Sequence, residues 1–343
     1  VFGINFGVAA DLNLAMVLRF VTLGVGGYVY YLVTEYVSLP LMDASHWFTW
    51  VLAFVLYDFC YYWLHRLGHE RTILWAAHVA HHQSEDYNLS TALRQTSTGF
   101  LFYWVFYLPL FLIGFPFEVL LTVYAVNLIY QFWVHTQIVR RLGVLDYILV
   151  TPSNHRVHHA QNERYIDKNY GGMLILWDRM FGTFQDELDE DPVIFGVRKP
   201  LANWNPFWAN LQVYDYLLFD ARHTRRWRDK LGIWFRRTGW RPPDVAKRFP
   251  KHAVDLAAFE KFDPVIPVAV KRYVLAQFGV AIAAMLIPTN DTFVALNTVR
   301  LPRNGQSTYY AMAWDAGSEF DSESCEWIPG PPCGNGGQHV LHH

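Results

Sequence analysis

The chain has 343 residues, of which 52% are hydrophobic, 17% aromatic and 17% charged. Because soluble domains usually carry about 25% charged residues, this composition argues against an ordinary soluble domain and indicates contact with lipid. The formal net charge is −2, but 20 of the 28 Lys and Arg residues lie between Arg140 and Lys261. One basic region between apolar segments indicates a cytoplasmic face. We expect no nucleic-acid partner, since this region is interleaved with histidine clusters and apolar segments.

Five apolar segments predict membrane helices. They cover residues 12–33, 47–64, 99–115, 117–135 and 268–287. The third and fourth segments are separated only by Pro116, as in a helical hairpin. The sequence therefore predicts an all-α integral membrane protein with about four to five transmembrane helices and a cytoplasmic helical cap. The bacterial cytoplasmic membrane and the endoplasmic reticulum both fit this multi-pass pattern.

The order of the segments places the histidine-rich regions on one side of the membrane. The connection over residues 34–46 contains Glu35 and Asp43 but no Lys or Arg, so it should face outward. The hairpin then returns the chain to the cytoplasmic side. Further along, residues 207–219 are aromatic and amphipathic, and they predict either an interfacial helix lying on the bilayer or an ordinary core helix.

The C-terminal part has a different composition. After Pro288 there are two basic residues against six acidic ones, which fits an external tail. Cys325 and Cys333 form a close pair that can be a disulfide in an oxidising compartment. We therefore divide the chain into a membrane-embedded domain over residues 1–288 and a small irregular or β tail over residues 289–343.

Three histidine clusters carry the strongest functional signal. They are His65-Arg-Leu-Gly-His69, His78-Val-Ala-His81-His82 and His155-Arg-Val-His158-His159. Residues three and four apart share one face of a helix, so each cluster can direct its imidazoles at a metal. One His-x-x-His-His pattern would arise by chance only about 0.03 times in a chain of this composition.

His135 is a further candidate ligand, because it lies at the cytoplasmic end of the fourth apolar segment. Nine imidazoles exceed the four ligands that one zinc ion takes, so the pattern predicts a two-metal site. The proposed ligands are His65, His69, His78, His81, His82, His135, His155, His158 and His159. Imidazole accepts zinc, copper, iron or nickel. A histidine-rich site under a lipid-accessible bundle suits two iron ions that activate dioxygen, and zinc can replace iron in a purified sample.

A carboxylate beside such a cluster can accept the second ring N–H of an imidazole and so fix its tautomer. Asp58, two turns before His65, is the candidate for this role, because an ionisable side chain at membrane depth is costly and is functional by default. Four other carboxylates are weaker candidates, which we expect at the surface or as helix caps: Glu85, Asp86, Asp167 and Asp178.

The order and membrane spacing of the clusters resemble the fatty acid hydroxylase and sterol desaturase superfamily of membrane di-iron enzymes, over about residues 47–185. Several local runs look most like its alkylglycerol monooxygenase branch. They are Tyr61-Tyr-Trp-Leu-His65-Arg, Leu74-Trp-Ala-Ala-His78, Asn88-Leu-Ser-Thr-Ala-Leu-Arg94-Gln, Gln131-Phe-Trp-Val-His135-Thr, Thr151-Pro-Ser-Asn-His155-Arg-Val-His158-His159, Asn169-Tyr-Gly-Gly172 and Trp177-Asp-Arg-Met-Phe-Gly-Thr-Phe184.

The resemblance implies oxidative attack by dioxygen on a lipid C–H bond. In the alkylglycerol branch the carbon next to the ether oxygen is hydroxylated, and the hemiacetal collapses to an aldehyde and a glycerol derivative, with tetrahydropterin as reductant. Other branches take electrons from a cytochrome or ferredoxin partner. Gln131 stands where some hydroxylases have another histidine, which leaves the ligand count open, and Asn154 stands before the third cluster where a histidine is common in close relatives.

Two alternatives to this function remain open at the level of sequence. A sterol or fatty acyl desaturase, or a carotenoid-type hydroxylase, would use the same site. A membrane metal transporter or storage protein would need ionisable residues through the spans, whereas here they collect at the ends. The tail, over residues 291–302 and 313–333, resembles part of a spondin-type secreted β-domain.

Overall fold

The computed structural model describes residues 6–203, 205–251, 255–265, 267–273, 275–276 and 279, together with four short strands between residues 308 and 342. For residues 6–20 and for the strands it describes the backbone alone. The chain divides into two units, Val1–Val265 and Ile266–His343. The predicted boundary after residue 288 stays a prediction.

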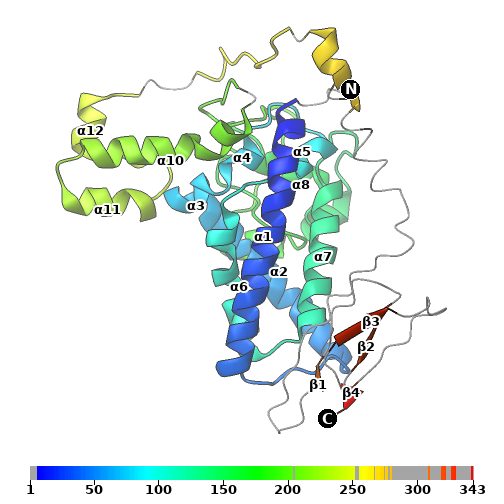
Figure 1. Cartoon of the computed structure of the whole chain (residues 1–343). Helices are drawn as coiled ribbons and strands as arrows, with labels where there is room; N and C mark the ends of the chain where they lie inside the picture. The colour runs from blue at the N-terminus through cyan, green and yellow to red at the C-terminus, as the bar shows by residue number, and fades with distance from the viewer. Residues whose placement is uncertain are drawn as a thin grey trace. The chain divides into compact units, whose positions relative to one another are not determined.

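Four helices of the first unit run side by side (Figure 1). They are α1 (Phe6–Tyr36), α2 (Trp47–Glu70), α6 (Tyr103–Ile113) and α7 (Phe117–Trp133). α2 packs against α6 and α7, and α1 packs against α6. The core between them is made of buried apolar side chains such as Ala53, Leu110, Phe115 and Val119. The first four predicted apolar segments are therefore helices.

The hairpin between α6 and α7 turns tightly because of two residues. Gly114 has φ +84°, and a Cβ there would lie 2.2 Å from the carbonyl oxygen of Leu39, so only glycine fits. Pro116 is the N-cap residue of α7 and has φ −59°. Proline has no backbone N–H, and its ring fixes φ near this value, so it suits the start of a helix. The third predicted segment begins with a 3₁₀ turn, Gly99–Leu101, rather than with an α-helix.

Membrane-spanning character is supported for one helix by length and composition. Among the described residues, α2 is long and apolar enough to cross a bilayer, while α6 and α7 are shorter apolar helices. The number of spans and their topology stay predictions. The fifth predicted span, over residues 268–287, lies largely outside the described residues.

Short helices form a cap at one end of this bundle (Figure 1). They are α3 (Thr72–Ala76), α4 (Val79–His82), α5 (Leu89–Leu93), the 3₁₀ helix η2 (Gly143–Tyr147), α8 (Pro152–His158) and α9 (Leu176–Phe181). α8 begins where Thr151 accepts a hydrogen bond from the backbone N–H of Asn154 and Pro152 occupies the first turn. This end of the bundle carries the histidine clusters.

The predicted helix over residues 207–219 is confirmed as part of α10 (Pro206–His223), which packs against α3 and α11 (Trp227–Phe235). Leu217 of α10 and Ile233 of α11 meet Ala76 of α3 in a small apolar core. The opposite face of α10 is exposed, including Phe207 and Leu211. α12 (Pro243–Arg248) follows.

The second unit contains two antiparallel strand pairs. β1 (Thr308–Tyr309) pairs with β4 (Leu341–His342), and β2 (Ser318–Asp321) pairs with β3 (Glu326–Pro329). Cys325 and Cys333 lie outside the described residues. So does most of the spondin-like run, so neither the disulfide nor that resemblance is tested.

Candidate metal centre

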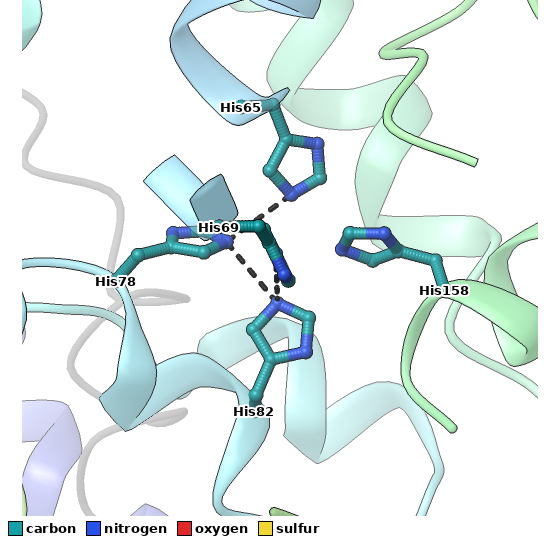
Figure 2. Close-up of side chains that lie close together, drawn as sticks. All are labelled: His65, His69, His78, His82 and His158. Carbon is teal, nitrogen blue, oxygen red and sulfur yellow. Dashed lines mark hydrogen bonds between the residues drawn. The ribbon is translucent and has the colours of Figure 1, made fainter. Parts of the chain in front are cut away.

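The structure gathers all nine candidate histidines into two adjacent groups. The five-histidine group contains His65, His69, His78, His82 and His158, and the four-histidine group contains His81, His135, His155 and His159. Within each group the candidate ligand nitrogens lie within 4.8 Å of one another. Figure 2 shows the imidazoles of the five-histidine group pointing toward a common centre.

Helix geometry explains how two short helices serve both groups. Neighbouring residues of a helix diverge by about 100°, so adjacent histidines point in different directions. α4 sends His82 to one group and His81 to the other. α8 sends His158 to the five-histidine group, while His155 and the C-cap His159 join the four-histidine group. α4 and α8 are therefore shared walls of the centre.

Four of the rings are oriented by backbone carbonyl oxygens. The Nδ1 atoms lie 2.7–3.0 Å from these oxygens, in the pairs His65–Tyr170, His158–Lys168, His81–Arg94 and His135–Gln131. A carbonyl oxygen can only accept a hydrogen bond, so each of these Nδ1 atoms carries the proton. The neutral ring then presents a bare lone pair on Nε2, which is the form that binds a metal.

The contact between His81 and His135 shows why a cation fits here. Their Nε2 atoms lie 3.3 Å apart. Both Nδ1 atoms are already protonated, so a hydrogen bond between the Nε2 atoms would need one ring to be a cation. Burial, and then the neighbouring His81, lowers the pKa of His135 well below the usual value. Two facing lone pairs repel each other unless a positive ion binds both.

The spacing of the other nitrogens fits the same conclusion. Two imidazole nitrogens that bind one ion at about 2.1 Å lie about 3.0 Å apart at a right angle and about 3.4 Å apart at a tetrahedral angle. The Nε2–Nε2 distances are 3.1 Å for His65–His78, His69–His82 and His78–His82. They are 3.0 Å for His135–His155 and 3.2 Å for His155–His159.

Burial keeps the imidazoles outside α2 neutral. It is the largest cause that lowers the pKa well below the usual value for His78, His82, His155, His158 and His159, with the neighbouring imidazoles adding to it. The Nε2 atom of His158 is buried and has no hydrogen-bond partner among the residues that the structure describes. Buried polar atoms without a partner are rare, so this nitrogen fits a ligand role.

Asp58 does not take the role that its sequence position predicted. Its carboxylate accepts hydrogen bonds from the backbone N–H groups of Met173 (2.8 Å) and Leu174 (3.0 Å) and from Trp177 Nε1 (2.9 Å). Among the hydrogen bonds of the described residues, none joins Asp58 to an imidazole. The carbonyl of Tyr170 orients His65 instead, and Asp58 holds the loop that contains this carbonyl.

Asp178 is also placed differently from the prediction. We expected it at the surface or as a cap, but it is fully buried. It accepts hydrogen bonds from the backbone N–H groups of Tyr170 and Gly171, both at 2.7 Å, and from Thr183 Oγ1. Burial raises the pKa of this carboxyl group to about 6. Asp178 therefore supports the same loop as Asp58, but it binds the backbone of Tyr170 and Gly171, whereas Asp58 binds that of Met173 and Leu174.

Two glycines let this loop approach the helices closely. A Cβ on Gly172 would lie 2.7 Å from the ring of Tyr61 and 2.8 Å from Asp58 Oδ1. A Cβ on Gly171 would lie 2.6 Å from the carbonyl oxygen of Leu174. Both distances are shorter than real Cβ atoms allow. Gly171 and Gly172 are therefore required for the path of the loop backbone.

The three remaining carboxylate candidates do not belong to the two groups of candidate ligands. Glu85 accepts a hydrogen bond from the backbone N–H of Phe262 at 2.7 Å, and Asp86 pairs with Lys261. Asp167 is partly buried in the left-handed backbone region, with φ +59°.

Gln131 and Asn154, the two departures from the expected histidine pattern, have structural partners. The Gln131 side chain accepts from the Tyr61 hydroxyl at 2.7 Å and donates to Asn127 Oδ1 at 2.6 Å. Asn154 donates to the carbonyl oxygen of Asp146 at 3.0 Å. Neither belongs to the two groups of candidate ligands.

Sequence reasoning missed the ion pair between Arg156 and Glu187. Arg156 donates two hydrogen bonds to the Glu187 carboxylate, at 2.8 and 2.7 Å, and two more to the carbonyl oxygens of Thr136 and Val139. It therefore ties α8 to the segment that follows His135. Arg156 stands in the third histidine cluster, but nothing in the sequence points to a partner 31 residues away.

Residues 50–183 match the family model described as fatty acid hydroxylase. The chain is 42% identical over 245 residues to alkylglycerol monooxygenase from Xenopus tropicalis, which covers 70% of this chain and 53% of the relative. It is 40% identical over 262 residues to the Homo sapiens protein of that name, covering 75% and 57%.

A more distant relative is ornithine lipid hydroxylase from Rhizobium tropici, 35% identical over 160 residues, which covers 44% of this chain and 46% of the relative. The chain spans about half the length of the relatives that it matches. No solved structure gives a significant match.

Proposed function

We propose that the chain is a membrane di-iron oxygenase that uses dioxygen to hydroxylate a lipid C–H bond, since residues 50–183 match the family model described as fatty acid hydroxylase. One observation carries the proposal: nine imidazoles lie in two groups, and eight of them have an Nε2 atom 3.0–3.3 Å from that of another imidazole of the same group. Iron bound by these groups would supply the activation of dioxygen that attack on an unactivated C–H bond needs.

The substrate class that we favour is the alkylglycerols, because the relatives of highest identity named above are alkylglycerol monooxygenases. Hydroxylation of the carbon next to the ether oxygen consumes one dioxygen, two electrons and two protons, and it releases one water. The hemiacetal then collapses to an aldehyde and a glycerol derivative. Tetrahydropterin is the proposed two-electron reductant, with a cytochrome or ferredoxin partner as the alternative source.

The residues around the centre would contribute orientation and protection from water. The carbonyl oxygens of Tyr170, Lys168, Arg94 and Gln131 hold the Nδ1 protons, so four rings present the same nitrogen inward. Burial of the rings keeps bulk water and protons away from them.

A lipid substrate would come from the bilayer around the helices. α7 exposes the apolar side chains of Leu121, Val126 and Ile129. We propose a multi-pass membrane location, with the centre on the cytoplasmic face and the tail outside. The Lys- and Arg-rich region that includes the third histidine cluster supports this orientation.

The test is a mass-spectrometric assay of anaerobically iron-loaded protein with an alkylglycerol, with and without tetrahydropterin. We expect about two iron ions per chain and dioxygen-dependent formation of an aldehyde. A fatty acid and an ornithine lipid assayed in parallel would identify another substrate class. One iron per chain, or no oxidised lipid from any of the three substrates, would contradict the proposal.

A further inference from the structure

α11 exposes a stripe of three large apolar side chains that nothing in the site uses. Trp227, Leu231 and Phe235 are spaced four residues apart, so they share one face of the helix. Their exposed fractions are 76%, 66% and 67%. Ile233 of the same helix is buried against Ala76 and Leu217, so α11 already packs against the protein through this residue. Single exposed apolar residues are common, but a continuous apolar stripe marks an interaction surface.

Positive charge surrounds this stripe. Between residues 222 and 237 there are seven basic residues and one acidic residue, Asp229. Asp229 is buried, whereas Arg225, Arg226 and Arg228 are exposed. Apolar side chains flanked by cations are typical of helices that lie in the interface of an anionic bilayer.

The fold attaches α11 to the end of the helix that is long and apolar enough to span a membrane. The backbone N–H of Thr238 donates to the carbonyl oxygen of Glu70 at 3.2 Å, and its hydroxyl donates to that of His69. On the other side, the hydroxyl of Thr72 donates to the carbonyl oxygen of Ile233. α11 is thus fixed at the C-terminal end of α2.

The direction of the helix is consistent with that position. In Figure 1, α10 and α11 run crosswise to α1 and α7. A helix that is crosswise to spanning helices, and attached where one of them ends, lies along the bilayer surface. With the membrane placement proposed above, the apolar stripe and its arginines would lie at the level of the lipid headgroups.

We propose that the Trp227, Leu231 and Phe235 face of α11 inserts into the headgroup region of the cytoplasmic leaflet, with the surrounding arginines bound to anionic lipid phosphates. This inference rests on the membrane placement proposed above. It assigns α11 as an interfacial anchor that steadies the cap over the end of α2. Thr238, shortly after α11, donates to the carbonyl oxygen of His69 at the end of α2, so the anchor would set the depth of the metal centre relative to the lipid.

The experiment uses the full chain in lipid nanodiscs, with Cys60, Cys325 and Cys333 replaced by serine. A nitroxide label is attached at Leu231→Cys, at Val126→Cys on the exposed side of α7, or at Lys247→Cys on the exposed surface of α12. Collisions with dioxygen, which concentrates in lipid, are compared with collisions with a nickel chelate that stays in water. Iron content is measured on each variant as a separate readout of the centre.

We expect the ratio of dioxygen to nickel-chelate collisions at Leu231→Cys to be several-fold higher than at Lys247→Cys and closer to that at Val126→Cys. If Leu231→Cys gives the same ratio as Lys247→Cys while Val126→Cys gives a lipid-exposed ratio, the proposed role of α11 is wrong but the membrane placement stands. The apolar face would then bind a soluble partner. A water-like ratio at Val126→Cys would overturn the membrane placement, and the inference with it.

A second comparison tests the charge. The Leu231 ratio should fall toward that of Lys247→Cys when phosphatidylglycerol is replaced by phosphatidylcholine. It should also fall when Arg225, Arg226 and Arg228 are all changed to Gln. A ratio that is unchanged in both cases would overturn the assignment of anionic lipid to this surface.

Discussion

The two histidine groups use the same ligand type but are held in place by different means. In the five-histidine group, the carbonyls of Lys168 and Tyr170 orient His158 and His65. Both belong to a loop that is distant in sequence from α2. In the four-histidine group, His135 is oriented by the carbonyl of Gln131, one turn earlier in its own segment.

The supports behind these carbonyls differ as well. The loop at the five-histidine group depends on Asp58 and Asp178, two buried carboxylates whose hydrogen bonds, within the described part of the chain, include no imidazole. The four-histidine group depends more strongly on the ion pair between Arg156 and Glu187, which ties α8 to the segment after α7. α8 and its C-cap supply two of the four imidazoles of this group but one of the five in the other group. Each group can therefore be weakened preferentially by residues outside the centre.

The largest effect is expected from removing a ligand candidate of one group. His82→Ala should abolish dioxygen-dependent turnover and lower the iron content from about two to about one ion per chain, because the five-histidine group loses an inward nitrogen. Turnover and iron analysis on the same preparation check this. His223→Ala is the matched control, since His223 lies on α10 outside both groups and should leave both measurements unchanged. Full turnover by His82→Ala would remove its ligand role.

The next largest effect is expected for Glu187→Gln, which leaves Arg156 buried without its charge partner. Breaking a largely buried ion pair costs about 3 kcal/mol of unfolding free energy. Iron should be lost first from the four-histidine group, because α8 loses its tie to the segment after His135. Unfolding in detergent, followed together with iron release, measures both effects.

The exposed ion pair between Arg141 and Asp189 provides the control for that change. Its side chains are 49% and 96% exposed, and such surface pairs contribute about 0–1 kcal/mol. Asp189→Asn should therefore leave stability and iron content as they are. Equal effects of Glu187→Gln and Asp189→Asn would show that the buried pair has no special role.

A smaller effect on iron binding is expected for Asp178→Asn, and it should concern the five-histidine group instead of the four-histidine group. The amide can accept from one of the two backbone N–H groups that the carboxylate holds, so the Tyr170 carbonyl shifts relative to His65. Loss of such an indirect support typically weakens metal binding about 10- to 100-fold. Chelator competition should show one weakened iron and one unchanged iron. Equal weakening of both would contradict separate supports.

The smallest effect is expected from mild acid. An ordinary histidine, with a pKa near 6.5, is about three-quarters protonated at pH 6.0. Burial lowers the pKa of His82, His135, His155, His158 and His159 well below that value. Iron affinity should therefore change little between pH 7.5 and pH 6.0 in either group.

The stability of the iron-free protein should behave differently from its affinity. Unfolded imidazoles take up protons below about pH 6.5, whereas the buried ones do not, so the unfolded state binds more protons. The unfolding free energy should fall as the pH drops below about 6.5. Unfolding of iron-free protein at pH 7.5 and 5.5 measures this, and equal stability at both pH values would show that the imidazoles are accessible to protons.

The sequence by itself determined the ligand candidates and the resemblance. Spacings of three and four residues put histidines such as His155 and His158 on one helix, and the cluster pattern resembles the fatty acid hydroxylase superfamily, whose family model matches residues 50–183. Apolar length predicted the helices of the bundle, since a helix that buries one side against its neighbours and another against lipid must be apolar nearly throughout.

Only the tertiary structure decided how the nine imidazoles divide and what holds them. Adjacent residues such as His81 and His82 point in different directions, and which group each joins depends on the packing of α4 and α8. The prediction for Asp58 failed because its partners lie more than 100 residues away, at Met173 and Leu174. Periodicity shows which face of a helix a side chain occupies. It does not show which distant loop will contact that side chain, because this contact forms only when the chain is folded.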